Sequence, residues 1–297
     1  PGFTPTGPNS CESGYKSMTE IKSLQNERVK AVVRLRDGRH RQKQGRFLID
    51  GLRELSRTFD TDITIREVFY CRTLCTVNQL QRLDVLLADM DDAADFDDED
   101  AVHGSEQIKL IAVSKAVFKK MAFGDRAEGI LAVAETPDRK LSDLWLPKNT
   151  LIAVIVGIEK PGNIGAVIRS ADAASVDAVI LADCRTDLFN PNAIRASLGT
   201  ILTLPVCQAT TTETIAWLRE RGLTIFAARV DGSVPYDQAD FSAGGAIVLG
   251  SEAQGLSDAW AGDDVRAIRL PMHGIADSLN ISATAAVLFY EALRQRS

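Results

Sequence analysis

The alternation of apolar and polar positions divides the first half of the chain into short strands and helices. Strands are predicted at residues 46–51, 61–71, 108–113 and 129–134, and helices at 21–36, 52–59, 78–90 and 114–121. A polar turn is predicted at 36–45. Strands that alternate with helices predict a small layered α/β domain over residues 20–135.

The second half has a clearer pattern. Residues 151–156 form a nearly unbroken apolar run, which is typical of a strand covered on both faces. Further strands are predicted at 178–182, 201–206, 224–228, 246–249 and 267–270, and helices at 164–175, 191–198, 212–221 and 281–294. This order predicts a parallel sheet with helices on both faces over residues 151–297, and it places ligands beyond the carboxyl ends of the strands.

Three polar segments lie outside these elements. Residues 136–150, which contain Pro137 and Pro147, are the predicted linker. Residues 1–19 are rich in Pro, Gly, Ser and Thr and predict a disordered leader, and residues 1–17, which precede Met18, are expected to derive from cloning. Residues 89–100 hold eight acids in twelve positions and predict a solvated, mobile loop.

Composition narrows the class of protein. Hydrophobic residues make up 45% and charged residues 25%, as in globular proteins with packed cores. No apolar run reaches the roughly 18 residues that a membrane span needs, so no membrane partner is expected. The five cysteines are scattered, and the spacing of Cys71 and Cys75 suits neither a redox pair nor a zinc site, so reduced thiols in a cytoplasmic protein are expected. With three histidines in the chain, no metal site is predicted.

Charge is unevenly distributed. The whole chain carries −6, but residues 22–57 hold eleven Lys or Arg and four acids, a local charge of +7 against −13 for the remainder. A basic segment on an acidic body is typical of a surface that docks phosphate, and it favours RNA as a partner. The alternative is a solvated helix face with many arginines.

The first of three candidate functional turns is at residues 159–169, between a predicted strand and helix. Its Gly162-x-x-Gly165 spacing matches neither a dinucleotide fingerprint nor a phosphate-binding P-loop, which argues against an ordinary Rossmann oxidoreductase. Asn163 is expected to cap the helix, and Arg169 follows within two turns. A helix N-terminus beside an arginine predicts an anion site, and a plain capped helix with a surface arginine is the alternative.

The other two turns also follow predicted strands. In residues 247–256, a strand ends at Gly250, where a glycine allows a ligand to approach the backbone. In residues 268–282, Ser278 and Asn280 precede an Ala-rich helix, and both could be simple N-caps. Each turn, taken alone, could be a tight bend.

Taken together and in order, the three turns resemble a known family. Asn163-x-Gly165-x-x-x-Arg169, Gly250-Ser-Glu252-x-x-Gly255-Leu256 and Leu270-Pro-Met-x-Gly274 with Ser278-Leu279-Asn280 are similar to the three motifs of the SpoU (TrmH) branch of the SPOUT RNA methyltransferases. Phe47-Leu-Ile-Asp-Gly51 and Ala127-Glu-Gly-Ile-Leu-Ala132 more loosely resemble the strand ends of the family's L30e-like RNA-binding domain, although Asp50 stands where Glu is more usual.

The resemblance implies an S-adenosylmethionine-dependent methyltransferase that acts on a ribose 2'-hydroxyl of RNA. It also implies a parallel-sheet SPOUT domain with a trefoil knot, which a pattern of strands and helices could not predict, and a homodimer packed through the knot. The donor is expected against Gly250, Leu270 and Leu279 with their neighbours Leu249 and Met272. The expected catalytic residues are Arg169, Asn163, Glu252, Ser278 and Asn280.

The role expected of Arg169 follows from its chemistry. A guanidinium resists deprotonation, so we expect Arg169 to hold the phosphate next to the ribose and to stabilise developing negative charge, rather than to act as a base. His273 is a weaker candidate base. The appended basic domain favours large-subunit ribosomal RNA as substrate. The alternatives are a transfer-RNA 2'-O-methyltransferase and a catalytically inactive RNA-binding protein with the same fold.

Overall fold

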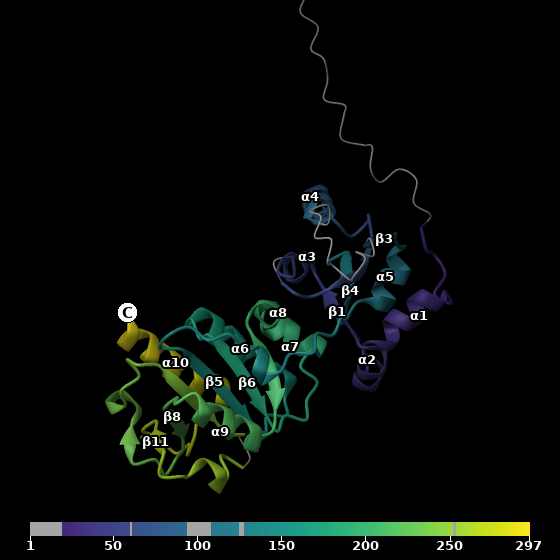
Figure 1. The fold of residues 1–297 in the computed structure, drawn as a ribbon. Helices are drawn as coiled ribbons and strands as arrows, with labels where there is room; N and C mark the ends of the chain where they lie inside the picture. Colours follow the sequence, from purple (N-terminus) through teal and green to yellow (C-terminus); the bar gives the residue numbers. More distant parts are fainter. Residues whose placement is uncertain (1–19, 60, 94–107, 125–127, 252–253) are drawn as a thin grey trace, which may run out of the picture.

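The computed structural model describes residues 20–59, 61–93, 108–124, 128–251 and 254–297. These residues form two sheets, each with its own helices (Figure 1). We call the four-stranded sheet with its helices the N-terminal unit, and the seven-stranded sheet with its helices the C-terminal unit. The predicted leader and most of the acidic stretch lie outside the described residues, as does Glu252.

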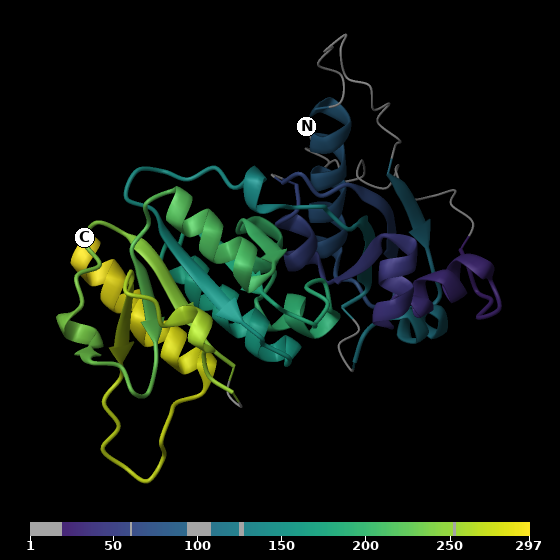
Figure 2. The ribbon, with the colours of Figure 1, turned by 60° about the horizontal axis from the view of Figure 1, so that its bottom comes forward.

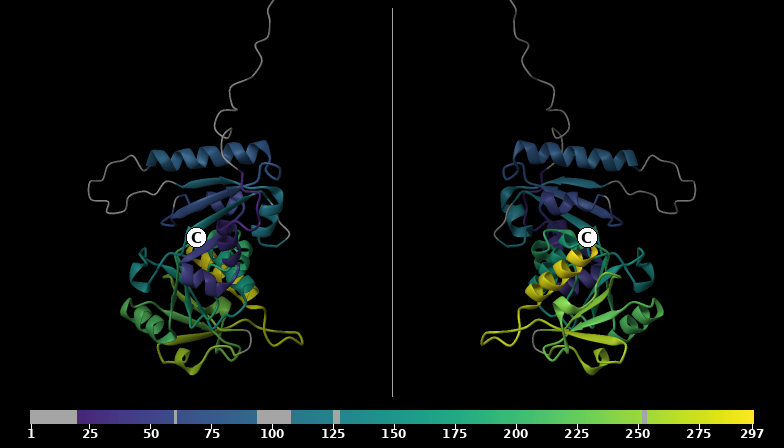
Figure 3. Two further views of the ribbon diagram at one scale, coloured as in Figure 1. Left: turned by 90° about the vertical axis from the view of Figure 1, so that its right-hand side faces the viewer. Right: turned by 90° about the vertical axis from the view of Figure 1, so that its left-hand side faces the viewer.

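The N-terminal unit is a mixed sheet of order β1-β4-β2-β3, in which β2 and β3 are parallel and the other neighbours are antiparallel. Its strands are β1 (Arg46–Asp50), β2 (Ile65–Tyr70), β3 (Lys109–Ala112) and β4 (Ile130–Glu135). Its helices are α1 (Glu27–Arg34), α2 (Gly38–Gln44), α3 (Leu52–Ser56), α4 (Val77–Ala93) and α5 (Lys115–Met121). Side chains alternate across the sheet, so Leu48 faces α1 and α5 whereas Phe47 and Ile49 face α3. Figure 3 shows α4 on the side away from the C-terminal unit.

The C-terminal unit is a sheet of order β7-β6-β5-β10-β8-β11-β9, and each of its neighbouring pairs is parallel. Its strands are β5 (Leu151–Val156), β6 (Ala178–Ala182), β7 (Val206–Ala209), β8 (Ile225–Ala228), β9 (Val234–Pro235), β10 (Gly245–Leu249) and β11 (Val265–Arg269). Its helices are α6 (Pro161–Ala173), α7 (Pro191–Ala196), α8 (Thr200–Thr203), α9 (Thr211–Glu220) and α10 (Ile281–Arg296). The central strands β5, β6 and β10 are apolar on both faces because α6 and α10 cover one face and α9 covers the other.

The two units share one hydrophobic core. Phe47 of β1 lies against Phe189, just before α7, with ring centroids 4.4 Å apart. Residues of β1, β5, β6, α6, α7 and α10 belong to the same cluster of buried side chains. Figure 1 shows α7 and α8 at the junction between the units. The predicted linker includes a short 3-10 helix, η1 (Leu141–Asp143), and its Leu144 packs in the cluster on the α9 side of the sheet.

Three predicted segments differ from the structure. Residues 21–26 are not helical, because Ile21 forms a parallel β-bridge with Val113 and α1 begins at Glu27. Residues 36–45 are not a turn, because Asp37 accepts a hydrogen bond from the Arg39 backbone N–H at 2.9 Å and starts α2, which ends at Gly45 in the left-handed conformation. Residues 201–205 are not a strand, because α8 extends to Thr203 and β7 begins only at Val206. Burial of Thr200, Ile201 and Leu202 stabilises this short helix despite its β-branched residues. Among the described residues, no helix combines the length and apolar character that a membrane crossing requires.

Candidate active site

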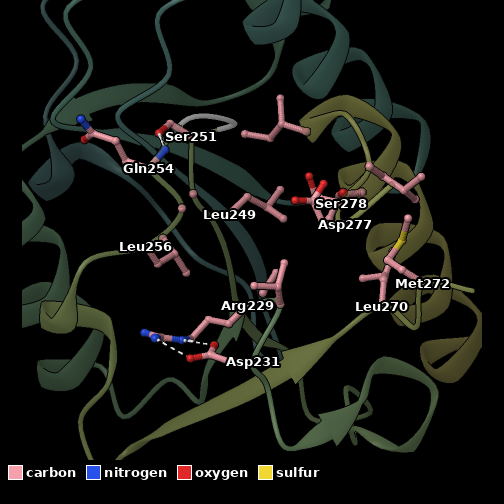
Figure 4. Close-up of a pocket in the computed structure, with 17 residues that line it drawn as sticks. Arg229, Asp231, Leu249, Ser251, Gln254, Leu256, Leu270, Met272, Asp277 and Ser278 are labelled. Atoms are coloured by element: carbon pink, nitrogen blue, oxygen red, sulfur yellow. Dashed lines mark hydrogen bonds and ion pairs between the residues drawn. The ribbon is translucent and has the colours of Figure 1, made fainter. Parts of the chain in front are cut away.

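A pocket of about 470 Å³ opens beyond the carboxyl ends of the parallel strands β8, β10 and β11 (Figure 4). This is where an open parallel sheet is expected to bind its ligand. Three segments form the pocket, one after each strand, and the start of α10 completes it. Its apolar side chains include Leu249, Leu256, Leu270, Met272, Leu279 and Ile281.

All five residues predicted to hold the donor line this pocket. Leu249 is the last residue of β10 and Gly250 follows it, whereas Leu270, Met272 and Leu279 belong to the segment between β11 and α10. Figure 2 shows this segment as a yellow-green loop that projects from the C-terminal unit. The structure therefore brings the second and third predicted turns to one cavity.

Gly250 is required by the backbone around it. A Cβ at this position would lie 2.3 Å from the carbonyl carbon of Gly255 and 2.7 Å from the backbone nitrogen of Leu256. The turn folds back on itself because the Gly255 N–H donates to the Ser251 carbonyl at 2.9 Å, and Gly255 has a φ of +64°. A pocket wall made of backbone and apolar side chains suits a flat base, which needs an apolar slot and a few hydrogen bonds.

The segment after β8 was missed from the sequence, although it lines the pocket with Arg229, Val230 and Asp231, next to Ala228 at the strand end. The Arg229 guanidinium donates two hydrogen bonds to the Asp231 carboxylate, at 2.9 and 3.1 Å, and these bonds lower the pKa of Asp231. The rule that ligands bind at the carboxyl ends of parallel strands would have found this segment, since the strand before it was predicted.

Ser278 and Asp277 also line the pocket, and Figure 4 shows both on the side opposite Ser251 and Gln254. Asn280 does not line it. Its side chain accepts hydrogen bonds from the Ser282 N–H at 2.9 Å and from the Ser282 hydroxyl at 2.6 Å, so it is the N-cap of α10. His273 is exposed and is not among the lining residues.

The first predicted turn lies on α6, outside this pocket. The helix begins at Pro161, which fits a first helical position because its missing N–H is not needed there. The prediction that Asn163 caps the helix is therefore wrong, because Lys160 occupies the cap position and Asn163 lies within the first turn. Arg169 is exposed two turns further on. Neither Asn163 nor Arg169 lines the pocket of its own chain.

Gly165 of the same turn serves helix packing. A Cβ there would lie 2.3 Å from the carbonyl oxygen of Ala193 and 2.7 Å from the Cβ of Ala196, both in α7. The glycine thus lets the backbones of α6 and α7 touch, which fixes α6 on its neighbour.

A parallel sheet with helices on both faces and a base-sized pocket at its strand ends defines an α/β enzyme for a nucleoside-containing ligand. Comparison with known proteins narrows this class. Residues 150–290 match the model of the SpoU rRNA Methylase family, and residues 26–132 match that of an MRM3-like substrate binding domain.

Relatives extend the match over both units. A crystal structure of an RNA 2'-O ribose methyltransferase is 36% identical, with a TM-score of 0.77 over 94% of this chain and 99% of that one. The AdoMet-bound rRNA methyltransferase from Sinorhizobium meliloti is 25% identical, with a TM-score of 0.80 over 93% and 98%. The 23S rRNA (guanosine(2553)-2'-O)-methyltransferase RlmP of Bacillus subtilis is 25% identical over 92% of this chain and 98% of its own length.

The chain therefore belongs to the SpoU rRNA methylase family. It is an RNA 2'-O-methyltransferase, and its methyl donor is S-adenosylmethionine.

Proposed function

We propose that this protein methylates the ribose 2'-hydroxyl of one nucleotide in large-subunit ribosomal RNA, in the cytoplasm. The observation that carries the proposal is the pocket at the ends of β8, β10 and β11, which the second and third family motifs line together. The full-length relative from Bacillus subtilis acts on 23S rRNA, and the N-terminal unit matches a substrate binding domain.

The residues present fit the donor. Gly250 brings backbone close to the cavity, and Leu249, Leu270 and Leu279 supply apolar contact for adenine. The sulfonium supplies an activated methyl group. In the transfer, a bond forms between the ribose 2'-oxygen and the methyl carbon, the carbon–sulfur bond breaks, the sulfonium becomes a thioether and the hydroxyl proton leaves to solvent.

Arg169 is the residue that we propose for the acceptor side. Its guanidinium holds the phosphate next to the reacting ribose and stabilises negative charge that develops on the 2'-oxygen. Asn163, Glu252, Ser278 and Asn280 are the other proposed acceptor residues. Ser278 reaches the pocket directly, and Asn280 acts by fixing the start of α10.

A homodimer with a knotted C-terminal segment is part of the same proposal. Val287 and Tyr290 lie three residues apart on α10 and are 36% and 52% exposed, which gives the helix an apolar stripe suited to a second copy. A partner would bring its own Arg169 towards the donor pocket, which lacks that residue within one chain. Light scattering after size-exclusion chromatography, with Tyr290→Asp as the interface variant, tests this: we expect a dimer that the variant dissociates.

The test of function uses ribosomal RNA from cells that lack the protein. Purified enzyme and S-adenosylmethionine with a labelled methyl group should transfer label to 23S rRNA, and mapping of 2'-O-methyl sites should find one new position. If the label appeared in bulk transfer RNA instead, the substrate would be transfer RNA and not ribosomal RNA. Titration calorimetry that detects no S-adenosylmethionine binding would favour the inactive RNA-binding alternative.

A further inference from the structure

The segment that contains α7 joins the N-terminal unit to the helix that carries the acceptor residues. It lies between β6 and β7 in the sequence, and Figure 1 shows it at the junction of the two units. One side of it contacts the N-terminal unit and another side packs on α6. Side-chain hydrogen bonds and a ring contact join it to the N-terminal unit, and a backbone contact joins it to α6.

The first contact is made by Arg41 of α2, whose side chain is 4% exposed. Its Nε donates to the Asp187 carboxylate at 2.5 Å, and its Nη1 donates to the carbonyl of Leu35, at the end of α1, at 2.7 Å. One buried guanidinium therefore ties α1 and α2 to the residues just before α7. A charge-assisted pair with one buried partner holds the two elements in one geometry.

The α1–α2 segment that Arg41 anchors is also the basic part of the chain. Its cations Arg34, Arg39 and Lys43 are exposed, and so is Arg46 at the start of β1. These side chains are free to meet a phosphate backbone, and Arg41 is the buried member of the same segment.

The second contact is made by Arg195, within α7. Its Nη2 donates to the carbonyl of Phe123, and its guanidinium lies 5.5 Å from the centre of the Phe123 ring. Arg36 lies 5.8 Å from the same ring and donates to the carbonyl of Ala122 at 2.7 Å. Phe123 is thus held between a guanidinium of the α1–α2 segment and a guanidinium of α7.

On its other side, α7 touches α6 through Gly165, where the two backbones leave no room for a Cβ. Asn163 and Arg169 lie on that same helix. The basic surface and the proposed acceptor residues are therefore connected by a series of contacts. Arg41 and Arg195 join the α1–α2 segment and Phe123 to the α7 segment, and Gly165 joins α7 to α6.

We propose that α7 sets the register between RNA docked on the α1–α2 segment and the acceptor residues of α6, with Arg41 and Arg195 as positioning residues. Neither arginine lines the donor pocket. The proposal rests on the proposed function, and it adds that a long RNA is aligned by contacts far from the methylated ribose. An error of about 1 Å in such alignment lowers a reaction rate by roughly 100-fold.

The experiment compares Arg195→Ala, Arg195→Lys and Asp187→Asn with the control Arg219→Ala, which removes an exposed ion pair to Asp264 on the far side of the sheet. Two RNAs are used: a 23S rRNA transcript, and a hairpin of about 20 nucleotides around the mapped site. We expect Arg195→Ala to lower kcat on the transcript by about tenfold or more. Its kcat/KM on the hairpin and its affinity for S-adenosylmethionine should stay near wild type, and Arg195→Lys should recover part of the loss.

Equal losses on both RNAs, or no loss on either, would overturn the proposal. A second measurement does not depend on methyl transfer. Hydrogen exchange of the α7 amides should be faster in Arg195→Ala and Asp187→Asn than in Arg219→Ala, because α7 loses a contact that fixes it to the N-terminal unit. Unchanged exchange would also overturn the proposal. If wild-type enzyme methylates no RNA while the exchange result holds, the proposed function fails and the mechanical link remains.

Discussion

The proposed donor pocket takes its shape from backbone at the ends of three strands, whereas the proposed acceptor residues Asn163 and Arg169 are side chains on one helix. The pocket needs Gly250 because Gly255 occupies the space of a side chain. The helix needs Gly165 for a different reason, since α7 must touch α6 there. The pocket is thus formed by the ends of the sheet strands. The position of Asn163 and Arg169 depends instead on how α6 packs on α7.

The strongest test of this comparison is Gly250→Ala. The new Cβ would meet Gly255 at 2.3 Å, so the turn must open and the pocket must change shape. A strain of about 3 kcal/mol, typical of overpacking, corresponds to roughly 100-fold weaker donor binding. Titration calorimetry measures it, and Gly162→Ala is the matched control because nothing lies within 4 Å of its Cβ. Unchanged affinity in Gly250→Ala would refute the backbone role.

The acceptor side is tested by Arg169→Ala. Methyl transfer to RNA should fall by about 100- to 1,000-fold, as after loss of one charge-stabilising donor, while donor affinity stays constant. Arg169→Lys should recover only part of the rate because lysine cannot hold a phosphate through two parallel bonds. Full activity in Arg169→Lys would contradict phosphate gripping.

The junction between the units is tested by pH. Burial, as the main cause, raises the pKa of Asp50 to about 6, although it accepts a hydrogen bond from the Phe123 N–H at 2.9 Å. The folded protein therefore binds this proton more tightly than the unfolded chain. The resulting stabilisation is complete below pH 4 and is lost as the pH rises through about 6, a change on the order of 2 to 3 kcal/mol.

Urea unfolding at several pH values should show that the free energy of unfolding of the wild-type protein falls as the pH rises from 4 through 6. The fall should be smaller in Asp50→Asn. The asparagine keeps an acceptor for the Phe123 N–H but cannot titrate. Identical slopes in the two proteins would show that Asp50 does not titrate in this range.

The smallest expected effect is that of Asn280→Ala. Loss of the α10 cap should lower the free energy of unfolding by about 1 kcal/mol. Asn280→Ser keeps a capping oxygen, so it should restore stability and most of the methyl transfer. A stable but inactive Asn280→Ser would mean that the amide itself contacts RNA.

The residues that line the pocket could be grouped from the sequence because strands and glycines leave strong local signals. The apolar run at 151–156 predicted β5, and Gly250 was expected at a strand end. The motif resemblance then joined Leu270 and Leu279 to the same pocket.

The acceptor side was harder to predict. Gly165 was predicted only as a motif position, and its packing on α7 depends on contacts that the sequence does not encode locally. α2 and α8 were missed because α2 has few apolar positions and α8 consists of β-branched and apolar residues stabilised by burial. Arg229 was missed since it matches no motif.

The shared core has a consequence for how the chain folds. Separation of the units would expose Phe47, Phe189 and the surrounding cluster to water, at about 25 cal/mol for each Å² of apolar surface. Unfolding of one unit alone would expose the shared core of the other and would cost free energy. Calorimetry should therefore record a single cooperative transition rather than two. Proteolysis would then cut the exposed connections without releasing an intact N-terminal fragment. Exchange of the N-terminal unit for another domain would require new side chains on the face that it shares with the C-terminal unit.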